Sequence, residues 1–297
     1  LRYLLTLAGL DARLLVVRQF GTMEPGPLAQ GGIYEGLLVQ VVPEGGEPFI
    51  VWADGRHAPY DYIPPGLRGQ DGVVVLGNGT MSRVTIPDSG AGADVLAVQV
   101  DIRFEGNDAV LEVEQQFHGM GALAWRREIE RLPPADLERL LSEGFVPRVL
   151  PGADVIALEV AGAEDASEPF ILRYRARIPN FGRGGPGGSL LVPPLFPTNL
   201  AAQQASLPSR TTSMGVPAFA QDVRVVIHGG QATQAPAEVE RGNIRYARRV
   251  IQEGPDVVIE RSIRVQNAVI PAQDYEAYAQ LVRELSQIDM VETPVTR

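Results

Sequence analysis

Long segments in which apolar and polar residues alternate are the feature that most restricts how this chain can fold. The clearest is Phe170–Ile178, where three arginines separate apolar residues. The apolar positions that share one face are Leu172, Tyr174, Ala176 and Ile178. Because side chains of a β-strand point alternately to its two faces, the pattern predicts a strand with one face on a core and one in water. A chain rich in such segments is expected to be α+β and mostly β.

Segments of the same kind recur between short turns rich in Gly, Pro, Asn and Asp. Residues 95–104 and 109–119 are expected to form a hairpin around Glu105-Gly-Asn-Asp108, and Gly77-Asn-Gly79 is a strong signal for another. The other expected strands are 12–19, 37–42, 49–52, 73–76, 82–86, 154–160, 222–228, 237–240, 243–252 and 256–266.

Three regions have the composition or spacing of helices. Residues 1–8 are expected to end a helix, and a pair of helices is expected near 122–143, split by Pro133-Pro134 and ended by Gly144. The last region, 271–288, carries an apolar stripe at spacings of three and four. Such a stripe is more often a docking face for a sheet than a ligand site.

The length of the chain allows two domains. Its 297 residues are 45% apolar, which is enough to fill a core in each. The character of the sequence changes after the segment 87–93, and we place a domain boundary there. Residues 1–87 form the first expected domain, and residues 94–297 form a second, β-sandwich-like domain with a few helices.

Composition disfavours several classes of function. All 26 basic residues are Arg and 36 residues are acidic, and the resulting net charge of −10 disfavours non-specific binding of nucleic acid. No apolar run approaches the roughly 20 residues that span a bilayer. The three His are far apart and none has a metal-ligand neighbour at short spacing, so a zinc site is not expected. No cofactor is expected either. The Gly-rich segment 182–188 lacks the Lys-Ser/Thr ending and helix start of a phosphate-binding loop.

The first quarter of the chain contains phrases similar to those of a known family. Leu7-Ala-Gly-Leu-Asp-Ala-Arg13 and Trp52-Ala-Asp-Gly55 resemble the bacterial transglutaminase-like superfamily. The resemblance implies the back half of a papain-like antiparallel sheet, with a catalytic Cys upstream of Leu1, a His on one strand and an Asp on the next. Asp54 matches that Asp, and Glu35 stands where the His is expected.

The rest of the chain also resembles this family, in its all-β carboxy-terminal domain. The motifs that carry this part of the resemblance are diffuse, and no activity is assigned to that region. They are Trp125-Arg126, Pro151-Gly152, Pro193, Arg210 and 270–278.

The Glu at the expected His position predicts a degenerate site. An imidazole is needed to deprotonate a thiol, and a carboxylate of pKa near 4 would repel the thiolate. Because the chain also contains no Cys, we expect a non-catalytic binding or assembly protein. Related transglutaminase-like proteins are commonly exported, so the resemblance implies a periplasmic or cell-surface location. The expected partners are proteins, recruited by strand addition at Phe170–Ile178 or 256–266, or a separate upstream chain segment. Neither nucleic acid nor a membrane span is expected.

Each residue of the expected site also has a structural interpretation. Asp54 is a good turn residue, with Gly55 supplying a positive φ. Glu35 at the start of an apolar strand is typical of a solvated edge residue. His57 is most simply an exposed loop residue.

Two enzymatic interpretations stay open. A Cys-dependent acyltransferase or amide hydrolase requires an upstream Cys, with His118 or His228 brought close to Asp54. A carboxylate-based hydrolase would pair Asp54 with Glu35 or Asp61 across a cleft of about 5 to 10 Å.

Overall fold

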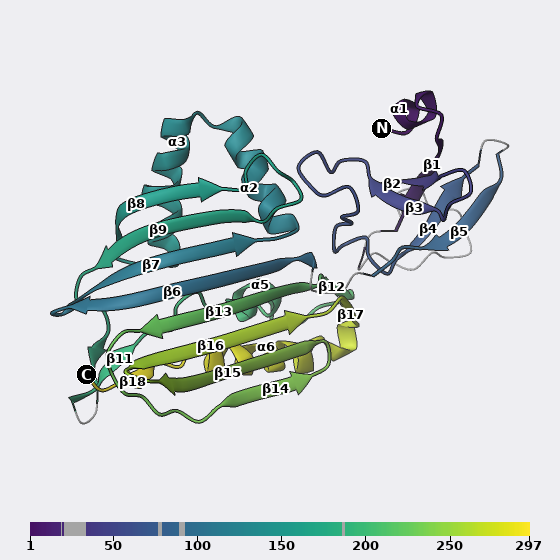
Figure 1. Cartoon of the computed structure of the whole chain (residues 1–297). Coiled ribbons are helices and arrows are strands. Elements are labelled where there is room, and N and C mark those ends of the chain that lie inside the picture. Colours follow the sequence, from purple (N-terminus) through teal and green to yellow (C-terminus); the bar gives the residue numbers. More distant parts are fainter. Residues whose placement is uncertain (19, 21–33, 77–78, 89–92, 186–187) are drawn as a thin grey trace.

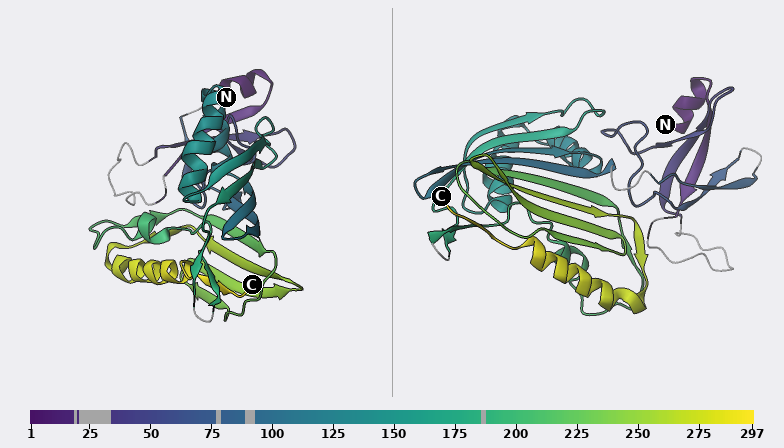
Figure 2. Two further views of the ribbon diagram at one scale, coloured as in Figure 1. Left: turned by 90° about the vertical axis from the view of Figure 1, so that its left-hand side faces the viewer. Right: turned by 60° about the horizontal axis from the view of Figure 1, so that its bottom comes forward.

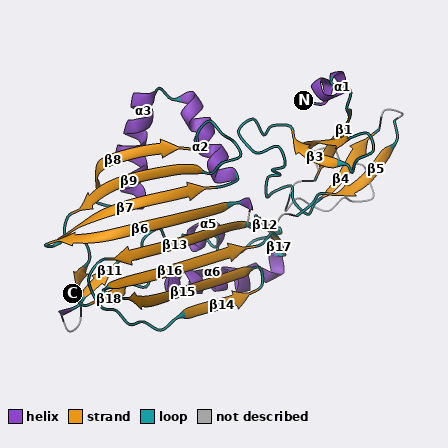
Figure 3. Cartoon of the chain, viewed as in Figure 1, coloured by secondary structure: helices purple, strands orange, loops and turns teal. Residues whose placement is uncertain are grey.

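The computed structural model describes residues 1–18, 20, 34–76, 79–88, 93–185 and 188–297 (Figure 1). Strands dominate and helices are few (Figure 3), so the expected α+β, mostly β class is confirmed. Within these residues the strands form a five-stranded sheet near the N-terminus, an eight-stranded sheet, and two small sheets of three and two strands. Parts of the segments singled out above lie outside the described residues: 19, 77–78, 89–92 and 186–187.

The five-stranded sheet is antiparallel and has the order β3-β2-β1-β4-β5. Its core includes Leu15 and Leu38 from the strands and Leu67 from the loop before β4. A short helix, α1 (Arg2–Leu7), precedes β1, and Gly9 lies between them at φ +82°, a region that favours glycine. The strands are β1 (Asp11–Val17), β2 (Gly36–Val42), β3 (Phe49–Trp52), β4 (Asp71–Val75) and β5 (Met81–Thr85). Residues 1–88 are called the N-terminal unit below.

The eight-stranded sheet has the order β14-β15-β16-β13-β6-β7-β9-β8. The strands β6 to β9 form one half of this sheet and the strands β13 to β16 form the other, and each half comes from one continuous part of the sequence. The halves meet at β6 and β13, which pair in parallel, and all other neighbouring strands are antiparallel. The strands are β6 (Val95–Glu105), β7 (Asp108–Phe117), β8 (Asp154–Ala161), β9 (Phe170–Ile178), β13 (Phe219–Ile227), β14 (Ala237–Arg241), β15 (Ile244–Glu253) and β16 (Asp256–Val265). Residues 93–297 are called the C-terminal unit.

Helices pack against one face of this sheet (Figure 2). The half from β6 to β9 is covered by α2 (Met120–Arg131), α3 (Pro134–Arg139), a π-helical turn η2 (Leu140–Phe145) and α4 (Val146–Val149). The other half is covered by α6 (Tyr275–Asp289), which follows the 3₁₀ turn η4 (Ala272–Asp274). The apolar stripe of α6 docks on the sheet as predicted, with Tyr275, Val282 and Leu285 buried. Helices therefore occupy the layer in which a β-sandwich places a second sheet.

Two groups of elements differ from the sequence predictions. Gly144 does not end the second helix: the chain continues through η2 into α4, because Leu141 and Val146 are buried in the core. Several short elements were not predicted, since two to five residues carry too little periodicity to detect. They are β10 (Arg183–Gly184), β11 (Leu190–Val192), α5 (Leu200–Gln204), β12 (Met214–Val216), β17 (Ala268–Ile270) and β18 (Thr293–Val295).

The two strands proposed for strand addition lie inside the sheet, so that prediction is wrong. β9 pairs with β7 and β8, and β16 pairs with β13 and β15. Both ladders of each strand are therefore satisfied, and neither strand offers an open edge. The edges of the eight-stranded sheet are β14 and β8.

Candidate functional site

Glu35 and Asp54, the two residues predicted from the family resemblance, line one cavity of about 470 Å³ in the N-terminal unit. Glu35 directly precedes β2, and Asp54 follows β3, the neighbouring strand. Both are exposed, and the Asp54 side chain is 83% exposed. Asp61 is also exposed but does not line this cavity.

Asp54 lies in a turn, as its structural interpretation predicts. The backbone N–H of Gly55 donates to the Trp52 carbonyl at 3.2 Å. Gly55 does not take a positive φ, contrary to the prediction; glycine fits there because a Cβ would lie 3.1 Å from the Trp52 ring. The Asp54 carboxylate accepts a hydrogen bond from Arg127 of α2 at 3.3 Å. Of the three His, all of them described, none lies within hydrogen-bond distance of that carboxylate.

His57 joins the two units and is only 20% exposed at its side chain, which corrects the exposed-loop prediction. Its Nε2 lies 2.8 Å from Glu130 Oε2 of α2, and Arg56 lies 2.6 Å from the other oxygen of that carboxylate. The backbone carbonyl of His57 also accepts a hydrogen bond from Arg126. Arg126 is itself buried and donates to the carbonyls of the loop before β9. The loop of the N-terminal unit that contains Arg56 and His57 is therefore held on α2.

Glu130→Gln is expected to make the protein less sensitive to acid. A hydrogen bond from His57, followed by the charge of Arg56, holds the pKa of Glu130 below its ordinary value of 4.5. A carboxylate with a lowered folded pKa contributes stability above its unfolded pKa, and this contribution is lost as pH falls through the folded pKa. The urea midpoint, followed from about pH 7 to about pH 3, should fall less steeply in the variant. Asp136→Asn, in an exposed pair within α3, is the control; equal slopes in wild type and Glu130→Gln would contradict this role.

A second concave site, absent from the sequence predictions, opens on the helix-covered face of the eight-stranded sheet. This groove has a volume of about 760 Å³. Strands β6, β7 and β13 supply four of its residues, Leu96, Gln115, Phe117 and Gln221. Its remaining residues come from four places: 145–152 around α4, 178–182 from the last residue of β9 onward, 193–199, and Met290 directly after α6.

Unusual backbone conformations gather at this groove. Among the described residues, the non-glycine residues with positive φ are Asn180, Phe196 and Asn199, at 51°, 53° and 52°. All three line the groove, as does Phe145 at the end of the π-helical turn η2. Strained φ values and π-helical turns are both enriched at functional sites.

Polar contacts hold Phe196 in its left-handed conformation. Its carbonyl accepts hydrogen bonds from Gln221 Nε2 at 3.0 Å and from Arg261 Nη2. Arg261 is in turn paired with Asp289 of α6 at 3.0 Å, and burial lowers the pKa of its guanidinium. Asp289 also accepts hydrogen bonds from the backbone and hydroxyl of Thr198. The segment 193–199 is thereby fixed between β16 and α6.

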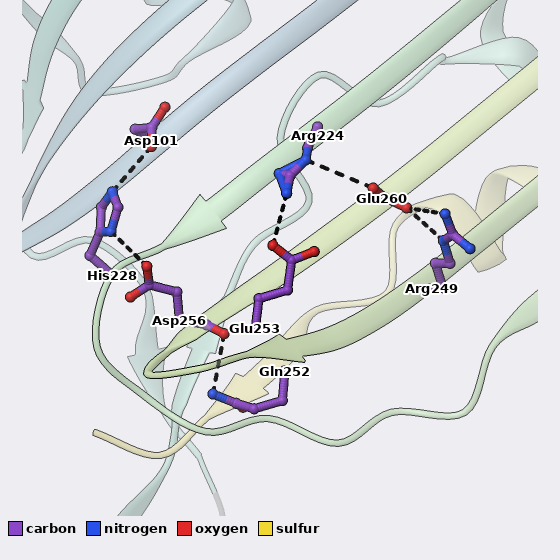
Figure 4. A network of polar contacts seen from close by, with 8 residues as sticks. All are labelled: Asp101, Arg224, His228, Arg249, Gln252, Glu253, Asp256 and Glu260. Atoms are coloured by element: carbon purple, nitrogen blue, oxygen red, sulfur yellow. Dashed lines mark hydrogen bonds and ion pairs between the residues drawn. The ribbon is translucent and has the colours of Figure 1, made fainter.

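The opposite face of the sheet carries paired charges (Figure 4). His228 lies between Asp101 and Asp256, 3.1 Å from each carboxylate. A backbone hydrogen bond from Gly229, with a smaller effect from His228, lowers the pKa of Asp256. Further pairs join neighbouring strands: Arg224 with Glu253 and Glu260, and Arg249 with Glu260. Because these charges satisfy one another across the strands, we interpret this face as a solvated surface.

Two classes of site find no support in the part of the chain that the structure describes. It contains no group of three or more His, Cys, Asp or Glu arranged to hold a metal ion. None of its helices is long and apolar enough to cross a membrane.

Comparison with known proteins gives one structural likeness. No family model matches the chain, and no curated protein matches it. A crystal structure from Parabacteroides distasonis, described as that of a candidate protease, superposes with a TM-score of 0.44 at 12% identity. The match covers 99% of this chain and 41% of that one, so the chain spans less than half the length of this neighbour.

The groove could have been partly foreseen from local sequence. Asn180 and Asn199 belong to the residue type that best tolerates left-handed φ after glycine, and Pro193-Pro194 and Pro197 mark an irregular segment. Nothing local indicates that these segments meet Gln115, because they come together only through the packing of the sheet and helices.

Proposed function

We propose that this protein is a non-catalytic binding protein that holds its ligand in the groove of the C-terminal unit. The observation that carries the proposal is the coincidence, at one groove, of apolar walls, buried carboxamides and three left-handed residues. Small-molecule and peptide sites are typically concave and mostly apolar, with a few placed polar groups. Left-handed residues cost about 1–3 kcal/mol each and persist where the surrounding structure holds them.

In this proposal the transglutaminase-like resemblance describes the ancestry of the N-terminal unit rather than its present chemistry. Glu35 stands at the expected His position, and Asp54 is hydrogen-bonded to Arg127 of the other unit. Because the Asp54 carboxylate binds Arg127 of α2, we assign Asp54 a role in joining the two units. The proposed periplasmic or cell-surface location follows from the same resemblance.

Calorimetric titration of the full chain with 8-anilinonaphthalene-1-sulfonate tests whether the groove binds ligands. We expect saturable binding that Met290→Trp weakens about tenfold, because a large ring would then fill the groove beside α6. Val269→Trp is the matched control, since Val269 is a similarly exposed apolar residue, on β17 outside the groove. Equal affinity of wild type, Met290→Trp and Val269→Trp, or the absence of saturable binding, would reject the proposal.

A further inference from the structure

We propose that the ligand of this groove is an apolar peptide segment that ends in a free C-terminal carboxylate. The inference rests on the proposed function and adds the chemical class of the ligand. It is drawn from three features of the groove: a cation that lacks an acidic partner, two buried carboxamides, and aromatic walls.

The cation is Arg148 of α4. It lines the groove, is exposed, and lies over the Phe145 ring, with its guanidinium carbon 6.0 Å from the ring centroid. Many arginines of the chain form ion pairs, but within the described residues no carboxylate lies within 4.0 Å of Arg148. A guanidinium binds a carboxylate through two parallel hydrogen bonds, so Arg148 is suited to an anionic end group.

The carboxamides are Gln115 of β7 and Gln221 of β13. Gln115 is 1% exposed and donates to the Tyr174 hydroxyl at 2.7 Å; Gln221 is 8% exposed and donates to the Phe196 carbonyl. A carboxamide has two N–H donors and an acceptor oxygen, and among the described residues neither side-chain oxygen has a hydrogen-bond partner. Both side chains can therefore pair with the N–H and C=O groups of a peptide.

The walls suit apolar side chains. Phe117, Phe145, Phe181 and Leu195 line the groove. An acyl chain would also pack against these walls. It would, however, cover the carboxamides of Gln115 and Gln221 without offering them hydrogen-bond partners, which costs free energy for each buried polar group. A peptide satisfies the walls, the carboxamides and Arg148 together, and on this ground we choose it over a fatty acid.

Trp125 provides a fluorescent reporter for the groove. Its ring lies 4.9 Å from the Phe145 ring and 5.9 Å from the Phe117 ring, both of which line the groove. The chain has two Trp, so Trp52→Phe leaves Trp125 as the single reporter. The Trp52→Phe variant of the whole chain is titrated with acetyl-Ala-Leu-Phe-Leu as the free acid, with the same peptide as its C-terminal amide, and with dodecanoate.

The free acid is expected to bind about tenfold more tightly than the amide, the effect of one charge-assisted contact. Arg148→Gln should weaken the acid about tenfold and leave the amide unchanged, so that the two peptides bind alike. Gln115→Met should weaken both peptides, with the unfolding midpoint measured to confirm that the variant folds. Arg175→Gln, an exposed arginine on the opposite face of the sheet, is the matched control and should change neither affinity.

Different failures separate this inference from the proposed function. If the protein that retains Arg148 binds the acid and the amide peptide equally well, the inference that the groove recognises a C-terminal carboxylate is wrong. Tight binding of dodecanoate without peptide binding would overturn the peptide and leave a groove that binds an acyl chain, so the proposed function would stand. If the dye, the peptides and dodecanoate all fail to bind, the proposed function fails with the inference.

Discussion

Asp94→Ala is expected to lower the free energy of unfolding by about 3–5 kcal/mol, because it removes one partner of a buried ion pair. The Asp94 carboxylate lies 2.6 Å from the Arg68 guanidinium, and the two side chains are 8% and 0% exposed. It also accepts hydrogen bonds from the Tyr62 hydroxyl at 2.6 Å and from the Met120 backbone N–H at 2.8 Å. Burial, with the nearby Asp94 charge, raises the pKa of Tyr62, which therefore stays a hydrogen-bond donor. The substitution thus leaves a buried cation and breaks a link between the units.

Urea unfolding followed by circular dichroism measures this loss. Asp94→Asn retains a side-chain oxygen as an acceptor but not the charge, so its effect should lie between those of wild type and Asp94→Ala. Glu112→Ala removes an exposed pair with Arg103, and it should cost far less because water solvates both charges. If Asp94→Ala unfolds at the same urea concentration as Glu112→Ala, Asp94 does not have the role assigned to it.

Asp289→Ala is the second substitution with a large expected effect, again about 3–5 kcal/mol from one half of a buried ion pair. Asp289 lies 3.0 Å from Arg261, with side chains 2% and 6% exposed, and accepts hydrogen bonds from Tyr246 and Thr198. Arg261 donates to the carbonyl of Phe196 at the groove. Loss of Asp289 should therefore weaken both the docking of α6 and the conformation of the segment 193–199.

Two measurements on Asp289→Ala separate these effects. The urea midpoint reports stability, and dye titration under conditions where the variant is fully folded reports the groove. We expect a lower midpoint and weaker dye binding. Glu292 lies three residues after Asp289 and forms an ion pair with Arg183 at the surface. Glu292→Ala removes this pair and should leave dye binding unchanged. Wild-type affinity in folded Asp289→Ala would show that the ion pair does not shape the groove.

The strands of this protein were largely predictable from sequence because their signal is local. Alternation placed β9 at Phe170–Ile178, as observed, and the Gly-containing turn after Glu105 placed the hairpin of β6 and β7. The closing helix was predictable for the same reason, since its stripe needs only a spacing of three and four. The failure at Gly144 shows the limit of local signals: its conformation is decided by the burial of Leu141 and Val146.

The candidate site was less predictable. Sequence resemblance drew attention to Glu35 and Asp54, and the structure does bring them to one cavity. The resemblance gave no reason to expect that Asp54 would meet Arg127, or that the segment 193–199 would be held by Asp289. Those contacts join residues 73 to 91 positions apart in the chain.

The sequence by itself determined the long strands, the closing helix and the apolar face of each, because periodicity and turn chemistry depend on neighbours a few residues away. Only the tertiary structure decided which strands became edges, how the N-terminal unit is held on α2, and where the groove opens. These features depend on which surfaces are buried together once the whole chain has packed, and buried charges such as Asp94 and Asp289 gain their importance from the exclusion of water there.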